Sequence, residues 1–438
     1  MSSHPESYWA QTAGAEPSVA QPLAGDRHAD VIVIGGGYTG LAAGHRLAGS
    51  LGLDTVVLEA HRFGWGASGR NGGFALISVG KLGLEERIRK WGLEAARRST
   101  RIGVEAVETV RELIATEPIA CDPQPDGWLV VAHRRGAVRE LQERARVYRE
   151  VLGYGDVDFL ARARLEQEGY LRGPSADGAI RFRTGFGLHP MKYVRGLASA
   201  AARRGAALFD RSPVVAWRRE GGDHLLVTPT GTVRARRVVV ATNGYTPEQL
   251  HPFFRGRVLP AASNIVVTRA LTEAEWNEVG MLTTQVYSDT RNLLFYWRRL
   301  PDGRLLFGGR AGVLDTVAQL RRRRRSLESA IEEKWPVLRG VGSDYFWCGN
   351  VCLSYDLMPH VNTVEGDPSI AYAMAYLGSG VALASYCGGL AADLVVGKAP
   401  PRDTPLTAAG LGRFPLPFLR RVYLAGAYVG YALKDRWL

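Results

Sequence analysis

The stretch Asp30-Val-Ile-Val-Ile-Gly-Gly-Gly-Tyr-Thr-Gly40, followed by Thr55-Val-Val-Leu-Glu59, decides the fold of this chain. The four residues before the first glycine form the continuous apolar run of a strand buried in a parallel sheet. Gly35 permits a tight turn, Gly37 lets the backbone approach a pyrophosphate, and Gly40 lets the next helix pack against the sheet. A strand, a glycine turn, a helix and an acid at this spacing predict a dinucleotide-binding βαβ unit.

The polar groups of this unit indicate how a nucleotide would bind. The helix predicted over about residues 38–49 begins with Tyr38 and Thr39, and its free N–H groups would bind the phosphates. Glu59 ends the second strand 19 residues after Gly40, where its carboxylate can accept hydrogen bonds from both hydroxyls of an adenosine ribose. An acid at this place disfavours a 2′-phosphate, and therefore NADP.

A glycine-rich loop after the acid indicates which dinucleotide cofactor binds. It runs from His61 to Phe74 and is too rich in glycine for the interior of a helix or strand. Its part Trp65-Gly-Ala-Ser-Gly-Arg-Asn-Gly-Gly73 resembles the flavoproteins of the D-amino-acid oxidase, glycine oxidase and sarcosine oxidase family. The resemblance implies FAD, with Ser68 at the pyrophosphate. It also implies FAD contacts from Ala60, Arg62, Gly66 and Ala67, and an approach to the isoalloxazine ring by Asn71, Gly72 and Gly73.

Three later segments extend the resemblance to about residue 396. Arg236-Arg-Val-Val-Val-Ala-Thr-Asn-Gly-Tyr245 is similar to the family's second FAD-contacting strand, and Ser212-Pro-Val-Val215 to the segment whose backbone binds adenine. Ala375-Tyr-Leu-Gly-Ser-Gly-Val-Ala-Leu-Ala384 resembles the family's Gly-x-Gly-Val-Ala loop, which begins a helix. The N–H groups of that helix would stabilise negative charge on the reduced flavin. The implied FAD contacts are Val214, Ala241, Thr242, Gly244, Gly378, Ser379, Gly380 and Val381.

Within this family the chain resembles the γ-glutamylputrescine oxidase-like members in particular. The similarity rests on Gly64–Gly73, Ala241–Tyr245, Asp302-Gly-Arg-Leu-Leu-Phe-Gly-Gly-Arg310 and the early Ser7-Tyr-Trp9. It implies FAD-dependent oxidation of a primary or secondary amine, such as an amino acid, an N-substituted amino acid or a polyamine derivative. A hydride would pass to flavin N5, the imine would hydrolyse, and O2 would reoxidise the flavin.

Four residues are candidates for the catalytic, substrate-facing side. Tyr296 and Arg298 stand at i and i+2 of one predicted strand and therefore share a face, on which Arg298 could clamp a carboxylate and Tyr296 could line the amine pocket. The alternative is a surface arginine and a tyrosine packed in the sheet. Tyr376, just before the ring-contacting loop, is a further pocket candidate. His360 lies near the ring in relatives and is either catalytic or structural.

Two positions depart from the sarcosine oxidase pattern. Those enzymes bind FAD covalently through a cysteine, and the matching place here holds Val351, with Cys352 one place along and facing the other side of a strand. We therefore predict non-covalent FAD. Those enzymes also use a lysine near the flavin for reaction with O2, whereas the matching place here is Leu306. An oxidase is favoured, and a dehydrogenase with another electron acceptor stays open.

The composition argues against several other classes of protein. The chain has no apolar run of about 18 residues, which predicts no membrane span, and its first 29 residues lack a signal peptide, which predicts a cytoplasmic protein. The four cysteines and nine histidines lack ligand spacing, so no metal is expected. The net charge of +12 comes mainly from arginine. We interpret the run Arg321–Arg325 as a solvated helix face rather than a nucleic-acid contact, although a basic protein can attract anionic substrates.

The predicted fold is α/β with two domains. One is a discontinuous, Rossmann-type FAD-binding domain on a parallel sheet, and the other is a substrate domain on a mostly antiparallel sheet that begins with one helix over Leu84–Thr116. The alternatives to a free-standing amine oxidase are a flavoprotein dehydrogenase and a flavin-holding subunit of a larger complex, and a homo-oligomer is compatible with both. The predicted ranges are 1–27 for an N-terminal arm, 28–75, 190–250 and 341–400 for the FAD domain, 76–189 and 251–340 for the substrate domain, and 401–438 for a tail packed on the FAD domain.

Overall fold

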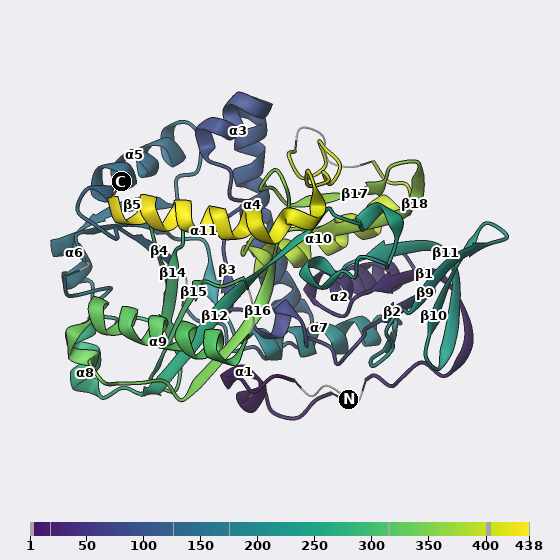
Figure 1. The fold of residues 1–438 in the computed structure, drawn as a ribbon, viewed down its shortest axis with the longest axis horizontal. Helices are drawn as coiled ribbons and strands as arrows, with labels where there is room; N and C mark the ends of the chain where they lie inside the picture. Colours follow the sequence, from purple (N-terminus) through teal and green to yellow (C-terminus); the bar gives the residue numbers. More distant parts are fainter. Residues whose placement is uncertain are drawn as a thin grey trace.

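Two eight-stranded sheets form this structure, a computed structural model that describes residues 4–17, 19–125, 127–174, 176–313, 316–399 and 404–437. Figure 1 shows the two sheets beside each other along the long axis of the molecule. One sheet is mainly parallel and the other mainly antiparallel, as the predicted fold class requires. The chain passes between the sheets several times, so neither is built from one continuous segment.

The mainly parallel sheet contains the predicted βαβ unit. Its order is β17-β18-β11-β1-β2-β8, and β1 pairs in parallel with both β2 and β11. Both faces of β1 are covered, because Val31 and Val33 belong to one apolar core and Ile32 and Ile34 to another. The strands are β1 (Gly25–Ile34), β2 (Thr55–Leu58), β8 (Ala207–Phe209), β9 (Ala216–Glu220), β10 (Asp223–Thr228), β11 (Gly231–Val240), β17 (His360–Val364) and β18 (Asp367–Met374).

Three helices cover one face of this sheet. Helix α2 (Tyr38–His45) begins directly after the glycine turn and packs against both α7 (Pro190–Arg203) and α10 (Gly380–Val395). The contact with α10 is very close, since a Cβ on Gly388 would overlap the carbonyl oxygen of Thr39. The N-termini of α2 and α10 are thereby held at the same end of the sheet, beside the carboxyl ends of β1 and β11.

The mainly antiparallel sheet combines strands from both predicted excursions. Its order is β16-β12-β15-β14-β13-β4-β6-β5, with only the β13–β4 pair parallel among the described strands. The strands are β4 (Trp128–Val131), β5 (Val157–Ala161), β6 (Gly178–Phe182), β12 (Leu259–Ala270), β13 (Val286–Asp289), β14 (Phe295–Arg299), β15 (Arg304–Arg310) and β16 (Tyr345–Leu353). A small ribbon of β3 (Phe74–Ala75) and β7 (Phe186–Gly187) lies apart from both sheets.

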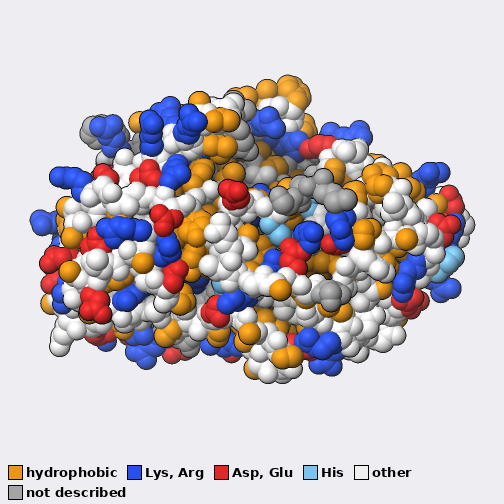
Figure 2. Space-filling view, turned by 90° about the horizontal axis from the view of Figure 1, so that it is seen from below, with side chains coloured by type: hydrophobic (Ala, Val, Ile, Leu, Met, Phe, Trp, Pro, Cys, Tyr) orange, Lys and Arg blue, Asp and Glu red, His pale blue; other side chains and the backbone are white. Residues whose placement is uncertain are grey.

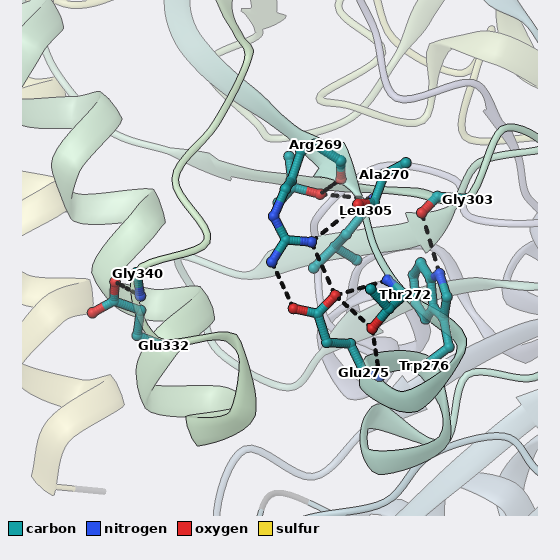
Figure 3. Close-up of polar contacts among 10 residues, drawn as sticks. Arg269, Ala270, Thr272, Glu275, Trp276, Gly303, Leu305, Glu332 and Gly340 are labelled. Atoms are coloured by element: carbon teal, nitrogen blue, oxygen red, sulfur yellow. Dashed lines mark hydrogen bonds and ion pairs between the residues drawn. The ribbon is translucent and has the colours of Figure 1, made fainter.

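Helix α8 (Glu273–Val279) fixes the outer end of the antiparallel sheet, as Figure 3 shows. Thr272 and Glu275 form a capping box, in which the Thr272 hydroxyl accepts from the Glu275 N–H at 3.2 Å and the Glu275 carboxylate accepts from the Thr272 N–H at 2.7 Å. The same carboxylate binds Arg269 at 2.6 Å, and the Trp276 indole donates to the Gly303 carbonyl at 3.2 Å. These bonds tie the end of β12 to the turn between β14 and β15.

The structure corrects two of the predicted boundaries. The helix predicted over Leu84–Thr116 is divided, because Gly92 adopts a φ of +85° that ends α3 (Leu84–Trp91) and starts α4 (Leu93–Thr116) in a new direction. Strand β16 was assigned to the FAD domain, but it pairs with β12 along nine residues of the antiparallel sheet. The remaining helices are α1 (Tyr8–Thr12), α5 (Ala137–Glu150), α6 (Arg162–Gln167), α9 (Val317–Lys334) and α11 (Arg420–Trp437).

The C-terminal tail divides between the two halves of the molecule. Its first part packs on the parallel sheet as expected, where the Leu406 carbonyl accepts from the Val361 N–H at 2.9 Å. Helix α11, yellow in Figure 1, departs from the prediction, because it runs across the antiparallel half. Its Asp435 accepts a hydrogen bond of 2.7 Å from the N–H of Asn292. Residues 401–403 and 438 of the predicted tail, like residues 1–3 and 18 of the predicted arm, lie outside the described residues.

Charge is dispersed over the surface. Figure 2 shows Lys and Arg side chains interspersed with acidic ones across one face of the molecule. The run Arg321–Arg325 lies in α9, but it is only partly a solvated face. Arg323 is buried, and Arg324 binds Glu328 at 3.1 Å and the Ser343 hydroxyl at 3.0 Å. None of the helices in the described part of the chain has the length and apolar character needed to cross a membrane.

Candidate functional site

A cavity of about 390 Å³ opens at the carboxyl ends of the parallel strands. It extends from Glu59 at the end of β2 to Gly380 and Val381 at the start of α10, and its volume is within the range usual for ligand pockets. The predicted residues that line it are Gly35, Gly37, Tyr38, Thr39, Glu59, Ala60, Gly66, Ala67, Ser68, Asn71, Val214, Ala241, Thr242, Tyr376, Gly378, Gly380 and Val381.

Other predicted residues lie outside this lining. Gly40 supports the turn from behind, because a Cβ there would overlap the Gly35 carbonyl oxygen. Arg62 forms an ion pair with Glu16 of the N-terminal arm. The predicted site residues that do not line the cavity are Gly40, Arg62, Gly72, Gly73, Gly244, Tyr296, Arg298, His360 and Ser379.

Glu59 is held at one end of the cavity by backbone groups. Its carboxylate accepts hydrogen bonds from the N–H of Gly36 at 2.6 Å and the N–H of His61 at 2.9 Å. Burial raises the pKa of this carboxyl group, nearby Asp210 adds to the effect, and the two backbone bonds oppose it. The carboxylate is thereby fixed at the strand end where the sequence places the ribose of a nucleotide.

The phosphate-binding part lies between the start of α2 and the glycine loop. Gly36 and Gly37 line the cavity with their backbones, and a Cβ on Gly37 would project to 2.8 Å from the Ser68 hydroxyl oxygen. That hydroxyl accepts from the N–H of Tyr38 at 3.0 Å, so it lies directly at the helix N-terminus. The gap that only glycine leaves open, together with the N–H groups of the helix, fits a pyrophosphate.

The glycine loop is fixed from its outer side by three different elements. Trp347 of β16 donates to the Arg70 carbonyl at 2.8 Å, Trp9 of α1 to the Asn71 carbonyl at 2.8 Å, and Arg298 of β14 to the Gly73 carbonyl at 3.1 Å. The Asn71 side chain fixes the loop internally, since its carbonyl oxygen accepts from the Gly73 N–H at 2.7 Å. The loop therefore has a defined path along the cavity.

The opposite end of the cavity is formed by the segment before α10. The Tyr376 hydroxyl shares a hydrogen bond of 2.8 Å with the Thr39 hydroxyl, which joins this segment to the start of α2. Burial raises the pKa of Tyr376 well above its ordinary value, so its hydroxyl stays protonated. Helix α10 has no side-chain cap on its first N–H groups, which makes its N-terminus a favourable place for negative charge.

Tyr296 and Arg298 share a face of β14, and both contact the glycine loop. The Tyr296 ring would meet a Cβ on Gly72 at 3.1 Å, and its hydroxyl lies 2.9 Å from the Ser263 hydroxyl. Arg298 is 1% exposed and donates to the carbonyls of Gly73 and Leu188. Burial lowers its pKa to about 9. Because two carbonyls engage its fork, the guanidinium fixes the loop, and this position does not support the predicted carboxylate clamp.

His360 lies at the first residue of β17, away from the cavity lining. Its ring nitrogens are bonded to Asp356 at 2.9 Å and to the carbonyl of Ala409 at 3.1 Å. The side chain is 1% exposed. Since both nitrogens have partners in the turn before β17 and in the tail, this geometry supports the structural alternative rather than a catalytic role.

The cysteine and lysine positions of the sarcosine oxidase pattern have a clear geometry here. Both Val351 and Cys352 border the cavity, although adjacent residues of a strand were expected to face opposite sides. Cys352 is buried, and burial raises the pKa of its thiol to about 12, so it is a poor nucleophile. Leu306 is fully buried within the antiparallel sheet and offers no polar group.

Sequence reasoning missed several residues that line the cavity. The His61 ring stacks on Trp65 at 3.8 Å, and the Tyr245 hydroxyl accepts from the N–H of Asn350 at 3.1 Å. Asn243 has a φ of +46° and accepts from the Ala375 N–H at 2.9 Å, which links the end of β11 to the segment before α10. His61, Trp65, Asn243 and Tyr245 lie within motifs singled out in the sequence, but the partners of Asn243 and Tyr245 are distant along the chain.

One cavity that reaches from a strand-end acid, past a glycine loop, to a helix N-terminus has the features of a dinucleotide-binding site. The chain belongs to the FAD dependent oxidoreductase (DAO) family, whose match spans residues 30–394. The predicted family and the predicted cofactor, FAD, are confirmed by this match. The residues that would hold FAD are those of the Gly37–Ser68 gap, Glu59 and the start of α10.

Individual relatives agree with this assignment. The chain is 31% identical to "Gamma-glutamylputrescine oxidoreductase" of Escherichia coli (strain K12), with 100% of this chain and 99% of that protein covered. It is 33% identical to "Probable oxidoreductase OrdL" of Rhizobium meliloti (strain 1021), with 98% and 97% covered. The crystal structure of glycine oxidase from Geobacillus kaustophilus has the same fold, with a TM-score of 0.69, 22% identity, and coverage of 89% of this chain and 100% of that one.

Proposed function

We propose that this FAD-dependent oxidoreductase oxidises a small primary or secondary amine to an imine, which hydrolyses in water, and that O2 is the electron acceptor. The observation that most supports this proposal is the position of the Tyr296 ring. It lies against Gly72 of the glycine loop, and the Phe74 and Tyr296 ring centroids are 5.7 Å apart. The antiparallel sheet thus reaches the part of the loop that the family resemblance assigns to the flavin ring. FAD, when bound, supplies the hydride acceptor.

The protein groups at this place are suited to positioning rather than to proton abstraction. Burial raises the pKa of Tyr296 to about 12, so both Tyr296 and Tyr376 are neutral hydrogen-bonding groups at ordinary pH. Hydride loss from a neutral amine requires no strong base, since the nitrogen lone pair forms the imine. We assign Tyr296 to the wall of the amine pocket and Tyr376 to its floor beside Thr39.

Anaerobic reduction tests the proposed reaction. The purified holoenzyme is mixed with γ-glutamylputrescine, putrescine, glycine and sarcosine in turn, and the flavin band at ~450 nm is followed. At least one of these amines should bleach the band and yield the corresponding aldehyde or oxo acid. Bleaching by NADH with none by any amine would refute the proposal, as would an absence of bleaching by every amine in a wider screen.

Reoxidation tests the acceptor separately. Leu306 leaves no lysine at the place where sarcosine oxidases have one, so fast reaction with O2 must come from other groups. Reduced enzyme is mixed with air-saturated buffer, and return of the band should be at least as fast as turnover with release of H2O2. Reoxidation slower than turnover would identify a dehydrogenase.

Acid precipitation tests the attachment of FAD. The raised pKa of the Cys352 thiol disfavours a covalent bond to the flavin, so the cofactor should remain in the supernatant. Yellow colour that stays with the precipitated protein, and moves with a peptide containing Cys352, would show that FAD is bound covalently through Cys352.

A further inference from the structure

Helix α11 and the turn before it expose an unusual amount of apolar surface. More than half of the large hydrophobic side chains that are exposed in the described part of the chain lie between Leu416 and Leu433. Phe418 is 79% exposed and Val429 is 63% exposed. Single exposed apolar residues are common on protein surfaces, whereas a group gathered in one place marks an interaction surface.

The exposed residues of α11 form one stripe along the helix. Val422, Gly426, Val429 and Leu433 follow at intervals of four, three and four residues, which places them on one face. A Cβ added to Gly426 would meet no atom within 4 Å, so nothing in the described chain covers this face. The opposite face holds the helix in place, because Leu424 is 5% exposed and belongs to an apolar cluster on β12. The outer stripe is therefore not needed for packing within the described chain.

The 3₁₀ turn Pro417–Leu419 extends the stripe beyond the start of the helix. The turn is held against Gly256, where a Cβ would lie 2.7 Å from the Pro417 side chain. Phe418 nevertheless points into solvent, and so does the preceding Leu416. We call the whole surface the α11 outer face, and it consists of Leu416, Phe418, Val422, Gly426, Val429 and Leu433.

Cations border the α11 outer face at both ends. Arg421 and Lys434 are exposed residues of α11, and Arg255 and Arg413 are exposed beside the turn at Gly256. No carboxylate of the described residues lies within ion-pair distance of these four. The single acid in the sequence of α11 is Asp435, which accepts a hydrogen bond from a backbone N–H of the loop before β14. The border of the face is thus positively charged and carries no acid of its own helix to neutralise it.

This charge pattern indicates the kind of partner. A second copy of the chain would use the same patch in a symmetric contact, and would bring these cations against one another. A membrane with anionic lipids has neither difficulty, because its phosphates neutralise the cations and its headgroup–acyl boundary accepts the apolar side chains. Such a helix lies along the membrane surface, and this contact is distinct from a membrane span.

We propose that the α11 outer face binds the surface of a membrane that contains anionic lipids. Phe418 and Val429 enter the boundary between headgroups and acyl chains, and Arg421 and Lys434 contact lipid phosphates. Helix α11 runs across the antiparallel half in Figure 1, so this half then lies next to the membrane. The inference goes beyond amine oxidation and does not depend on it.

Vesicle flotation with the FAD-loaded enzyme tests the proposal. One vesicle is pure phosphatidylcholine, and the other is an equimolar mixture of phosphatidylcholine and phosphatidylglycerol. The wild-type enzyme should float with the mixed vesicles and stay behind with the neutral ones. Raising the salt to ~0.5 M should weaken the binding, because lipid charges are then screened within a few ångströms.

Variants show whether the α11 outer face is the part that binds. Val429→Asp should weaken flotation at least about tenfold, because it places a charge where an apolar side chain enters the membrane. Arg421→Gln and Lys434→Gln should each weaken it about fivefold. The matched control is Val337→Asp, an exposed valine of the 3₁₀ turn Pro336–Leu338, which should float as wild type does. Thermal unfolding and FAD content, measured on every variant, should match wild type.

Three outcomes overturn the proposal. Wild type that does not float with the mixed vesicles rejects a membrane partner, and equal flotation of wild type and Val429→Asp rejects the α11 outer face. A wild-type dimer in sedimentation velocity that Val429→Asp separates, without any flotation, identifies a second copy as the partner. Flotation requires no turnover, so its result is independent of whether an amine bleaches the flavin.

Discussion

Buried charge is treated differently in the two halves of the molecule. In the parallel half, Glu59 accepts from two backbone N–H groups, and Glu117 at the end of α4 binds His45, Arg203 and Arg204 at 2.7–3.0 Å. In the antiparallel half, the buried Arg298 donates to two backbone carbonyls, and no carboxylate of the described residues lies within ion-pair distance of it. These carboxylates of the parallel half are therefore held by N–H groups and cations, whereas Arg298 is held by carbonyl groups alone.

This difference predicts that the two halves can be damaged independently. Gly37→Val should abolish FAD loading, because the added side chain would fill the gap before Ser68, where a Cβ alone reaches 2.8 Å. The measurement is the flavin-to-protein ratio after purification, with Gly155→Val as control, since that exposed glycine has nothing within 4 Å. Normal FAD content in Gly37→Val would show that the cofactor is placed wrongly.

Arg298 belongs to β14 of the antiparallel sheet, but it donates hydrogen bonds to the carbonyls of Gly73 and Leu188. Arg298→Met leaves the carbonyls of Gly73 and Leu188 without their donor, which should cost about 3 kcal/mol of stability and weaken FAD binding. Arg298→Lys keeps the charge but not the fork, and should recover only part of the loss. Thermal unfolding and FAD titration measure both. A changed KM for the amine, with FAD affinity intact, would instead make Arg298 a substrate clamp.

The ion pairs of Glu117 in the parallel half should make the stability of the protein depend on pH. Burial alone would raise its pKa, but the hydrogen bonds from His45, Arg204 and Arg203 outweigh burial and lower it to about 2. The stabilisation is therefore fully present above pH 4.5 and is lost as the pH falls toward 2. Glu117→Gln should lower the free energy of unfolding by about 1–2 kcal/mol at pH 7, since its arginine partners stay solvated. Urea unfolding from pH 7 to 3.5 should show the difference shrinking in acid. A constant difference would mean that Glu117 acts by packing alone.

Trp9 provides the smallest expected effect. Trp9→Phe removes one hydrogen bond to the Asn71 carbonyl, worth about 1 kcal/mol, so FAD should bind up to roughly fivefold more weakly. Trp347→Phe removes the equivalent bond to the Arg70 carbonyl and should have a similar effect, measured by the same FAD titration. If both variants load FAD as tightly as wild type, the outer bonds do not set the path of the loop.

The nucleotide half could be predicted from sequence because its signals are local. The turn at Gly35, the helix from Tyr38 and the acid Glu59 follow one another within a single βαβ unit, and short-range geometry fixes their relation. The shared face of Tyr296 and Arg298 was likewise predictable from the strand period. The role of Arg298 was not predictable, because its hydrogen-bond partner Gly73 lies 225 residues away.

The contact of Arg310 with the segment before α10 could not be predicted for the same reason. Arg310 is unremarkable in an arginine-rich chain, and only tertiary packing brings its guanidinium to the carbonyl of Leu377, 67 residues later. The break at Gly92 was missed because amphipathic spacing continues across it, and a single positive φ redirects the helix. Strand β16 was misassigned because sequence pattern shows that a strand exists but not which sheet receives it.

The interleaving of the two sheets has a consequence for how the protein unfolds and can be dissected. Strand β1 pairs with β11 about 200 residues later, and β12 pairs with β16 across the whole of α9, so neither sheet is encoded by a separable fragment. Expressed halves should not fold alone. Calorimetry of the intact holoenzyme should show one main transition rather than two. Contacts of such long sequence separation also predict slow refolding from denaturant, with flavin recaptured only after the late segment before α10 has docked.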